Sequence, residues 1–169
     1  VVTRSFIWGI IGDSFPAWQQ RQMSLISKHD GPRTAIQLVT PATLEPWSAG
    51  QPPLARSWLE RQQFKAKTGQ FAWLPGDTGA PDSVVAGWDG KDPLESLGSL
   101  PFGLPEGVYE LTGTATPLQL LGWGFGAYQF DRYRAPERQP ADLLVPAGVD
   151  GDALLGEAAA LRLVRALIN

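Results

Sequence analysis

The sequence predicts an α/β domain, a layered fold in which a mostly buried sheet lies between helices. Two observations predict it. Short apolar runs typical of strands alternate along the chain with segments whose apolar residues have helical spacing. The 169 residues, of which 43% are hydrophobic and 18% charged, are enough to bury one core.

The first organised half of the chain is predicted to hold two kinds of element. Residues 34–40 (TAIQLVT) should be a strand, because their side chains alternate between two faces and Pro41 flanks the run. Residues 52–64 should be a helix, since their apolar residues share one face and proline stands at the start. Residues 69–76 and 82–90 are short apolar runs bounded by Gly, Pro and Asp, which predicts two strands joined by a turn.

The middle of the chain continues the alternation. Residues 92–105 are predicted to be a short helix that Asp92 caps and Pro101 ends. Residues 106–113 (EGVYELTG) are predicted to be the next strand.

The last part of the chain begins with a Thr-Pro helix signal, and helical spacing is kept over residues 116–134. Residues 141–148 (ADLLVPAG) should be the last strand, and Asp150 or Asp152 should cap a final helix. The apolar stripe of that helix is predicted to consist of Leu154, Ala158, Leu161, Val164 and Ile168.

Residues 1–33 are predicted to be an N-terminal extension or tail that precedes an α/β domain over residues 34–149. The only methionine, Met23, opens a polar, turn-rich stretch, so the natural start is expected there. The alternative is that residues 1–22 form a genuine extra strand and helix. The apolar run at 5–12 is far shorter than the roughly 20 residues of a membrane span, so no membrane partner is expected.

Composition excludes several classes of site. The chain has no cysteine, which excludes disulfides, thiolate nucleophiles and cysteine-bound zinc. It has one histidine, so a Ser-His-Asp triad would depend on His29, which lies in a polar stretch predicted to be loop. The net charge of −3 provides no overall attraction to nucleic acid, and we expect no nucleic-acid partner.

The sequence GWGFGA at 122–127 matches the glycine pattern of dinucleotide-binding turns. That pattern binds a pyrophosphate only where it follows a strand and opens a helix, whereas these glycines lie inside a predicted helix. The favoured interpretation is structural: Gly122 and Gly126, four residues apart, let another element approach the helix closely.

A group of carboxylates surrounds the predicted turns, and they could in principle form a metal or acid–base site. Asp is also favoured at turns and caps, and no partner base can be named, so the structural interpretation is preferred. The predicted hairpin connection at 74–83 has no Lys-Ser/Thr pair and is not a Walker loop. The carboxylates are Asp77, Asp82, Asp89, Asp92 and Glu95.

Three arginines, Arg132, Arg134 and Arg138, accompany Tyr133 in FDRYRAPER. Such a group could bind phosphate or nucleic acid. The preferred interpretation is a solvated helix end, where arginine is favoured near the C-terminal dipole.

Taken together, GWGFGAYQFDRYR (122–134), LLVPAG (143–148) and LGEAAALRLVRALIN (155–169) resemble the leucyl (cytosol) aminopeptidase family of metallopeptidases. The upstream stretch from TAIQLVT to AGW (34–88) looks like the amino-terminal domain of shorter bacterial members. The resemblance covers residues 34–169, and residues 1–22 match nothing in that family.

The resemblance implies a macro-domain-like mixed sheet flanked by helices, followed by a long C-terminal helix at 150–169 that links to a catalytic domain missing from this chain. In the family, that catalytic domain holds two divalent metal ions, Zn or Mn, with Lys, Asp and Glu ligands and a catalytic Arg. Its hallmark Asn-Thr-Asp-Ala-Glu-Gly-Arg segment is absent here, so no catalytic, cofactor-binding or metal residue is assigned to this chain. A cytoplasmic hexamer is the expected assembly of the full-length protein.

The leading hypothesis is therefore a fragment: the non-catalytic amino-terminal domain of a metal-dependent leucyl aminopeptidase, serving packing or oligomerisation. A second hypothesis is a macro-like module that binds a nucleotide or ADP-ribose. It needs a ribose-facing aspartate, and Asp77, Asp89 and Asp92 lie near predicted strand ends, but no phosphate-binding loop is found. A third is a stand-alone oligomerisation domain.

Overall fold

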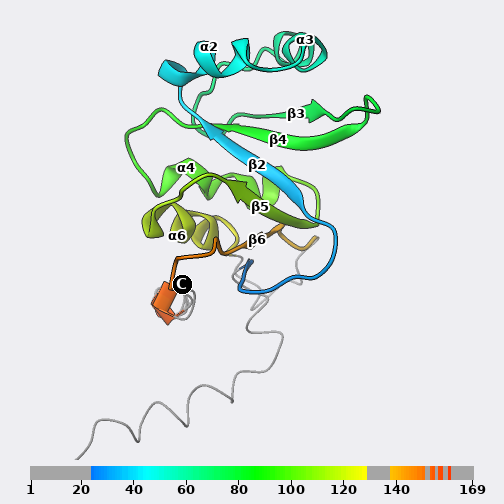
Figure 1. The fold of residues 1–169 in the computed structure, drawn as a ribbon. Coiled ribbons are helices and arrows are strands. Elements are labelled where there is room, and N and C mark those ends of the chain that lie inside the picture. The colour runs from blue at the N-terminus through cyan, green and yellow to red at the C-terminus, as the bar shows by residue number, and fades with distance from the viewer. Residues whose placement is uncertain (1–23, 129–137, 151–152, 155, 158–159, 161–169) are drawn as a thin grey trace, which may run out of the picture.

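The computed structural model describes residues 24–128, 138–150, 153–154, 156–157 and 160. Strands and helices alternate along these residues, and the strands join in one sheet (Figure 1), so the predicted α/β class is confirmed. The elements are β1 (Leu25–Ile26), β2 (Thr34–Val39), α2 (Pro41–Ala49), α3 (Pro53–Arg61), β3 (Phe71–Pro75), β4 (Pro81–Gly87), α4 (Glu95–Gly98), α5 (Leu100–Gly103), β5 (Val108–Thr112), α6 (Pro117–Gly126) and β6 (Asp142–Leu144).

The sheet is mixed and six-stranded, with the order β1-β6-β5-β2-β4-β3. The central strand β2 pairs in parallel with β4 on one side and with β5 on the other. β6 is parallel to β5 and to β1, whereas β3 is antiparallel to β4, as the predicted hairpin requires. The carboxyl ends of β1, β2, β4, β5 and β6 therefore meet at one edge of the sheet.

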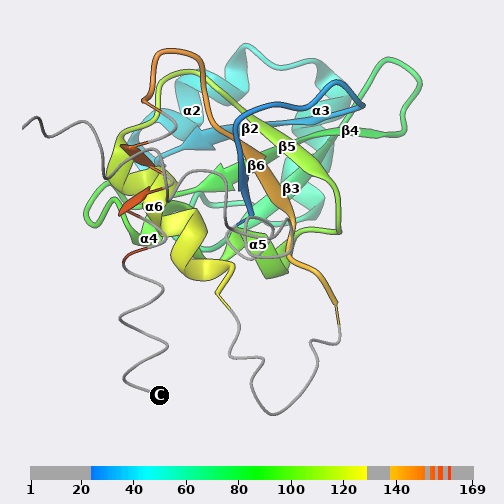
Figure 2. The ribbon, with the colours of Figure 1, turned by 90° about the horizontal axis from the view of Figure 1, so that it is seen from below.

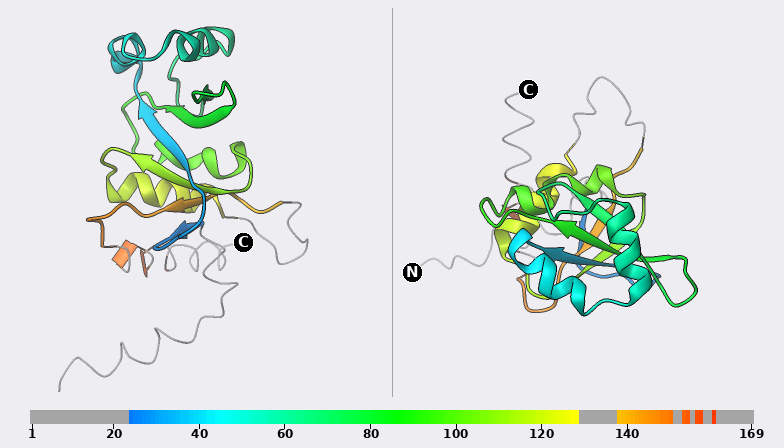
Figure 3. Two further views of the ribbon diagram at one scale, coloured as in Figure 1. Left: turned by 45° about the vertical axis from the view of Figure 1, so that its right-hand side comes forward. Right: turned by 90° about the horizontal axis from the view of Figure 1, so that it is seen from above.

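Helices cover both faces of the sheet, which explains why its strands are largely apolar. α2 and α3 lie together beside β3 and β4 (Figure 1), and α4, α5 and α6 form a group on the other side (Figures 2 and 3). The cluster beneath α3 consists of Val39, Ala55, Leu59, Phe64, Ala66, Ala72, Leu74 and Val85. The larger cluster beneath α4, α5 and α6 includes Ile36, Val84, Leu97, Leu100, Leu104, Tyr109, Leu120, Trp123 and Leu143.

Trp123 of α6 is fully buried at the centre of the larger cluster. Its indole Nε1 donates to the Ala141 carbonyl oxygen at 3.2 Å, and its ring packs against Tyr109 with the two centroids 6.4 Å apart. The Tyr109 hydroxyl donates to the Pro105 carbonyl oxygen at 3.1 Å. Both aromatic side chains thus bury their apolar surface without leaving a polar atom unpaired, a condition that buried Trp and Tyr usually meet.

The helix predicted over 116–134 begins where expected but ends earlier. Thr116 is its N-cap, and a capping box with Gln119 satisfies the first backbone N–H groups. The helix stops at Gly126 with Ala127 as C-cap, and residues 129–137 lie outside the described part of the chain.

The single helix predicted over 92–105 is wrong in its detail, because the segment forms α4 and α5 separately. Pro101 does not end a helix but lies in the first turn of α5, where a missing N–H costs nothing. Asp92 is not the N-cap of α4, which is Leu94, but it holds the turn before the helix, since its Oδ1 accepts the backbone N–H of Leu94 at 2.9 Å.

Two elements of the structure were not predicted from the sequence. α2 begins directly after β2, with Thr40 as N-cap and a capping box to Thr43. β1 lies within the stretch that was expected to be a polar tail, and its Leu25 is buried beside Leu143 of β6. A two-residue strand shows no alternation, so its pattern could not reveal it.

The C-terminal part is described only in places. The strand predicted at 141–148 is the shorter β6. Of the two residues predicted as possible caps, Asp150 caps the following helical turn, because its Oδ1 accepts the Ala153 N–H at 3.0 Å, and Asp152 lies outside the described residues. Residues 161–169 of the predicted long helix lie outside the described residues. Among the residues described, no helix has both the length and the apolar character that crossing a membrane requires.

Candidate functional site

The carboxyl edge of the parallel strands is the place in an open α/β sheet where ligands usually bind. The connection after β4 brings Asp89, Asp92 and Glu95 to this edge. Asp77 and Asp82 belong instead to the β3–β4 hairpin, which lies at the opposite, amino end of β4. The carboxylates that are neighbours in sequence are therefore divided between two edges of the sheet.

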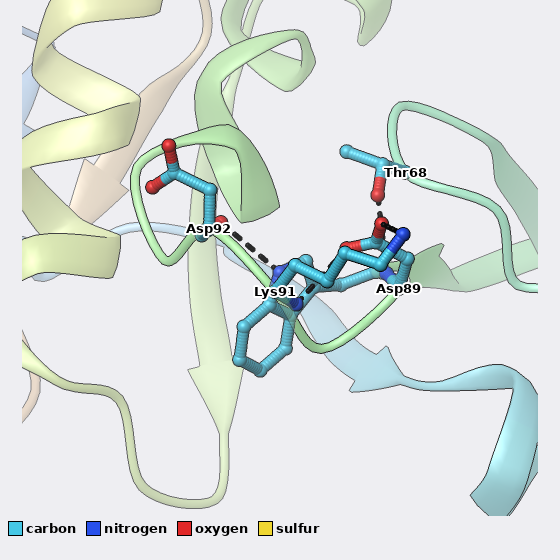
Figure 4. Close-up of polar contacts among 5 residues, drawn as sticks. Thr68, Asp89, Lys91 and Asp92 are labelled. Carbon is cyan, nitrogen blue, oxygen red and sulfur yellow. Dashed lines mark hydrogen bonds and ion pairs between the residues drawn. The ribbon is translucent and has the colours of Figure 1, made fainter.

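At the carboxyl edge, the connection after β4 is held by its own polar groups (Figure 4). The backbone N–H of Asp89 donates to the Thr68 hydroxyl at 3.1 Å, which ties this turn to the connection between α3 and β3. The carboxylate of Asp89 accepts the backbone N–H of Lys91 at 3.0 Å and lies 3.4 Å from the Lys91 ammonium. The Trp88 indole Nε1 donates to the backbone carbonyl oxygen of Asp92 at 3.1 Å. Asp89 and Asp92 thus build a turn and start α4.

The pKa of Asp89 lies below its usual value of 3.8. The main cause is the hydrogen bond that its carboxylate accepts from the Lys91 backbone; partial desolvation opposes this, and the Lys91 side chain and the Thr68 hydroxyl lower the pKa further. Asp89 is therefore ionised at neutral pH and has no proton to donate, so it is suited to holding the turn rather than to general acid chemistry.

The helices that begin at the carboxyl edge use part of their first N–H groups in their own caps. α2 follows β2 and α6 follows β5, two adjacent strands, so both helix N-termini lie at this edge. Such termini bind phosphate through their first N–H groups. Here the side chain of Thr40 accepts the backbone N–H of Thr43, and that of Thr116 accepts the backbone N–H of Gln119. The Gln119 Oε1 in turn accepts the Thr116 backbone N–H at 2.8 Å. The caps thus use some of the donors that a phosphate would need.

The GWGFGA sequence has the structural role that was predicted for it. Gly122 and Gly126 face the backbone of α4 and the turn before it: a Cβ at residue 122 would lie 2.9 Å from the carbonyl carbon of Leu94. A Cβ at residue 126 would lie 2.6 Å from the carbonyl carbon of Gly98. No side chain larger than hydrogen fits at either position without movement of the backbone. The glycines therefore permit close packing of α6 on α4.

The remaining candidates are isolated. His29 lies in a loop, as predicted, and its Nε2 is 3.2 Å from the Pro32 carbonyl oxygen. Arg138 donates to the Leu104 carbonyl oxygen and lies over the Phe102 ring, 6.0 Å from its centroid. Arg132 and Arg134 lie outside the described residues. Within the described ranges, no three His, Asp or Glu side chains are grouped so that they could hold a metal ion.

The fold defines the class of protein: an α/β domain on one mixed sheet, whose candidate side chains build turns, caps and a close helix contact. Residues 34–146, more than half of the chain, match the model of the M17 aminopeptidase N-terminal domain. The chain therefore belongs to the M17 aminopeptidase family, as an N-terminal domain, and the resemblance read from the sequence is confirmed.

Two solved structures are similar to this chain. The cytosol aminopeptidase of Coxiella burnetii has 25% sequence identity and a TM-score of 0.73, over 86% of this chain and 33% of that chain. A K354E mutant of tomato leucine aminopeptidase has 11% identity and a TM-score of 0.48, over 82% of this chain and 35% of that chain. This chain thus spans about a third of the length of either enzyme. No curated protein matches it.

Proposed function

We propose that this chain is the non-catalytic amino-terminal domain of a metal-dependent leucyl aminopeptidase, which removes N-terminal residues from peptides. The match of residues 34–146 to the N-terminal domain of this family carries the proposal. The similarity to a third of the Coxiella burnetii cytosol aminopeptidase supports it, because the remaining two thirds of such an enzyme have no counterpart here. The catalytic domain then belongs to another part of the same polypeptide.

Catalysis by the whole enzyme would use two divalent ions, Zn or Mn, which polarise a peptide carbonyl and activate a water. The residues described here do not fit that chemistry. Asp89 is bound to Lys91, Asp92 starts a helix, and no third ligand joins them in the described part of the chain. We therefore assign no catalytic or metal-binding residue to this domain.

The domain itself would serve packing, both against the catalytic domain and within a hexamer of the full-length protein in the cytoplasm. Residues 150–169 would be the helix that links the two domains. Asp89 holds a turn, and Thr40 and Thr116 cap helices. This supports the packing role, because the outer surface of the domain is then the part available to partners.

The activity can be tested with the 169-residue chain alone. We expect it to show no hydrolysis of a leucine anilide in the presence of Mn²⁺ or Zn²⁺, and measurable turnover that follows the purified chain would contradict the proposal. The packing role requires the longer polypeptide: deletion of residues 34–146 should reduce the number of protomers in its assembly, which light scattering gives as the measured mass divided by the mass of the shortened chain. An unchanged assembly would contradict the packing role while leaving the first result intact.

A further inference from the structure

β3 is the last strand of the sheet, so one side of its backbone has no neighbouring strand. An exposed strand edge presents N–H and C=O groups to which another chain can pair. Alternate residues of a strand direct these groups to opposite sides. Gln70 directs its carbonyl oxygen to the Gly87 N–H of the β4 side, so the peptide groups of Phe71, Trp73 and Pro75 face outward.

The side chain of Gln62 occupies the central position of this edge. Its Oε1 accepts the backbone N–H of Trp73 at 3.0 Å, and its Nε2 donates to the Trp73 carbonyl oxygen at 3.0 Å. The same Nε2 donates to the Trp58 carbonyl oxygen at 3.2 Å, at the end of α3. A side-chain amide has the donor and acceptor of a peptide group, so Gln62 takes the place that one residue of an added strand would occupy.

The two ends of the edge are covered by different means. Pro75 has no N–H to offer to an added strand, and the pairing register with β4 shifts between Leu74 and Pro75. At the other end, the Gln70 side chain accepts the Lys65 N–H at 2.8 Å and donates to the Gln63 carbonyl oxygen at 2.9 Å. The connection that supplies Gln62 therefore also lies against the beginning of β3.

We infer that the connection between α3 and β3 closes this edge of the sheet against strand addition, and that Gln62 is the residue that keeps it closed. The sequence of β3, FAWLP, explains the need: its Phe71 and Trp73 side chains are only partly buried, and the strand carries no charge. Apolar, uncharged strands at the edge of a sheet are prone to pair with one another.

The partner of an opened edge is a second copy of this chain. β3 of a second copy, placed antiparallel, would offer the same Trp73 groups in return, which is the symmetry of an isologous dimer. Partners of the unaltered domain are then excluded from this edge and must contact its other surfaces. The inference does not depend on which enzyme the domain belongs to.

The test compares the 169-residue chain with its Gln62→Ala variant. Amide hydrogen exchange of Trp73, followed by NMR at low concentration, should be about tenfold faster in the variant, because its N–H loses its partner. Sedimentation velocity over a concentration series should show a species of larger mass, formed with a second copy, in the variant and not in the wild type. Gln63→Asn is the matched control: the neighbouring amide is exposed, its φ of 51° suits asparagine, and neither quantity should change.

A second variant separates the loss of the amide from a loss of packing. Gln62→Met keeps the length of the side chain without its donor and acceptor, and it should reproduce both effects even where Gln62→Ala loosens α3. The inference would be overturned if, in both variants, the Trp73 amide exchanged at the wild-type rate and the sedimenting species had the wild-type mass. Faster exchange without added mass would also overturn it, because Gln62 would then not be the residue that excludes a second copy.

Discussion

Gly126→Ala tests whether the glycines of α6 set the distance between α6 and α4. A Cβ at residue 126 would lie 2.6 Å from the carbonyl carbon of Gly98, and its oxygen is nearer still. Carbon atoms in contact are ordinarily about 3.5 Å apart, so the two backbones would have to separate by about 1 Å. Neither side of this contact is a flexible side chain that could turn away.

The expected cost follows from two opposing effects. Overpacking a well-packed interior costs about 1–3 kcal/mol. The upper value, about 3 kcal/mol, applies here because the contact is between two backbones. Alanine favours the helix over glycine by about 1 kcal/mol. The net loss in the free energy of unfolding should therefore be about 2 kcal/mol, or a fall in Tm of about 4–8 °C for a domain of this size.

The measurement is thermal unfolding followed by tryptophan fluorescence and near-UV circular dichroism, which both report on the chain's seven tryptophans, the buried Trp123 among them. Gly50→Ala is the control, because Gly50 has a φ of −79° and its Cβ would lie an ordinary 3.5 Å from the Trp47 carbonyl oxygen. That variant should unfold at the wild-type temperature or slightly above it. A Gly126→Ala variant as stable as wild type would refute the assignment of these glycines to close packing.

Two further predictions concern the carboxyl edge. The pKa of the Asp89 carboxyl, measured by NMR titration, should lie below 3.8. Its contribution to stability should be complete above that pH and should be lost as the pH falls through the lowered pKa. A measured pKa at or above 3.8 would contradict the described turn. Calorimetry with ADP-ribose at millimolar concentration should show no heat of binding, because capping boxes occupy part of the first N–H groups of α2 and α6 and the nearby Asp89 is negatively charged; saturable heat would favour the nucleotide-binding hypothesis.

Local signals in the sequence predicted most of the elements. Thr116 followed by Pro117 marked the start of α6, and the hairpin of β3 and β4 was visible as two apolar runs around a glycine-rich turn. The Thr40-Pro41 pair is the same signal as Thr116-Pro117, so α2 could have been found by the same reasoning. β1 could not, because the burial of Leu25 depends on β6, which lies far along the chain.

The contacts that decide what the site residues do are not local, and this limits what the sequence could predict of them. Asp89 is tied to Thr68, and Gln62 to Trp73, by pairings that exist only once the chain has turned back on itself. The four-residue spacing of Gly122 and Gly126 inside a helix predicted a close approach by another element, but it did not show that α4 is the neighbour.

Several of the residues that looked chemically capable in the sequence are engaged by the fold. The carboxylate of Asp89 is paired with Lys91, Asp92 accepts the backbone N–H of Leu94 before α4, and Gly126 admits the backbone of α4. A side chain engaged in this way cannot serve a reaction without loosening the fold, since catalysis needs groups that are held in place and yet free to react. The engagement of these groups therefore favours a domain that acts through its surface over one that acts through a catalytic site.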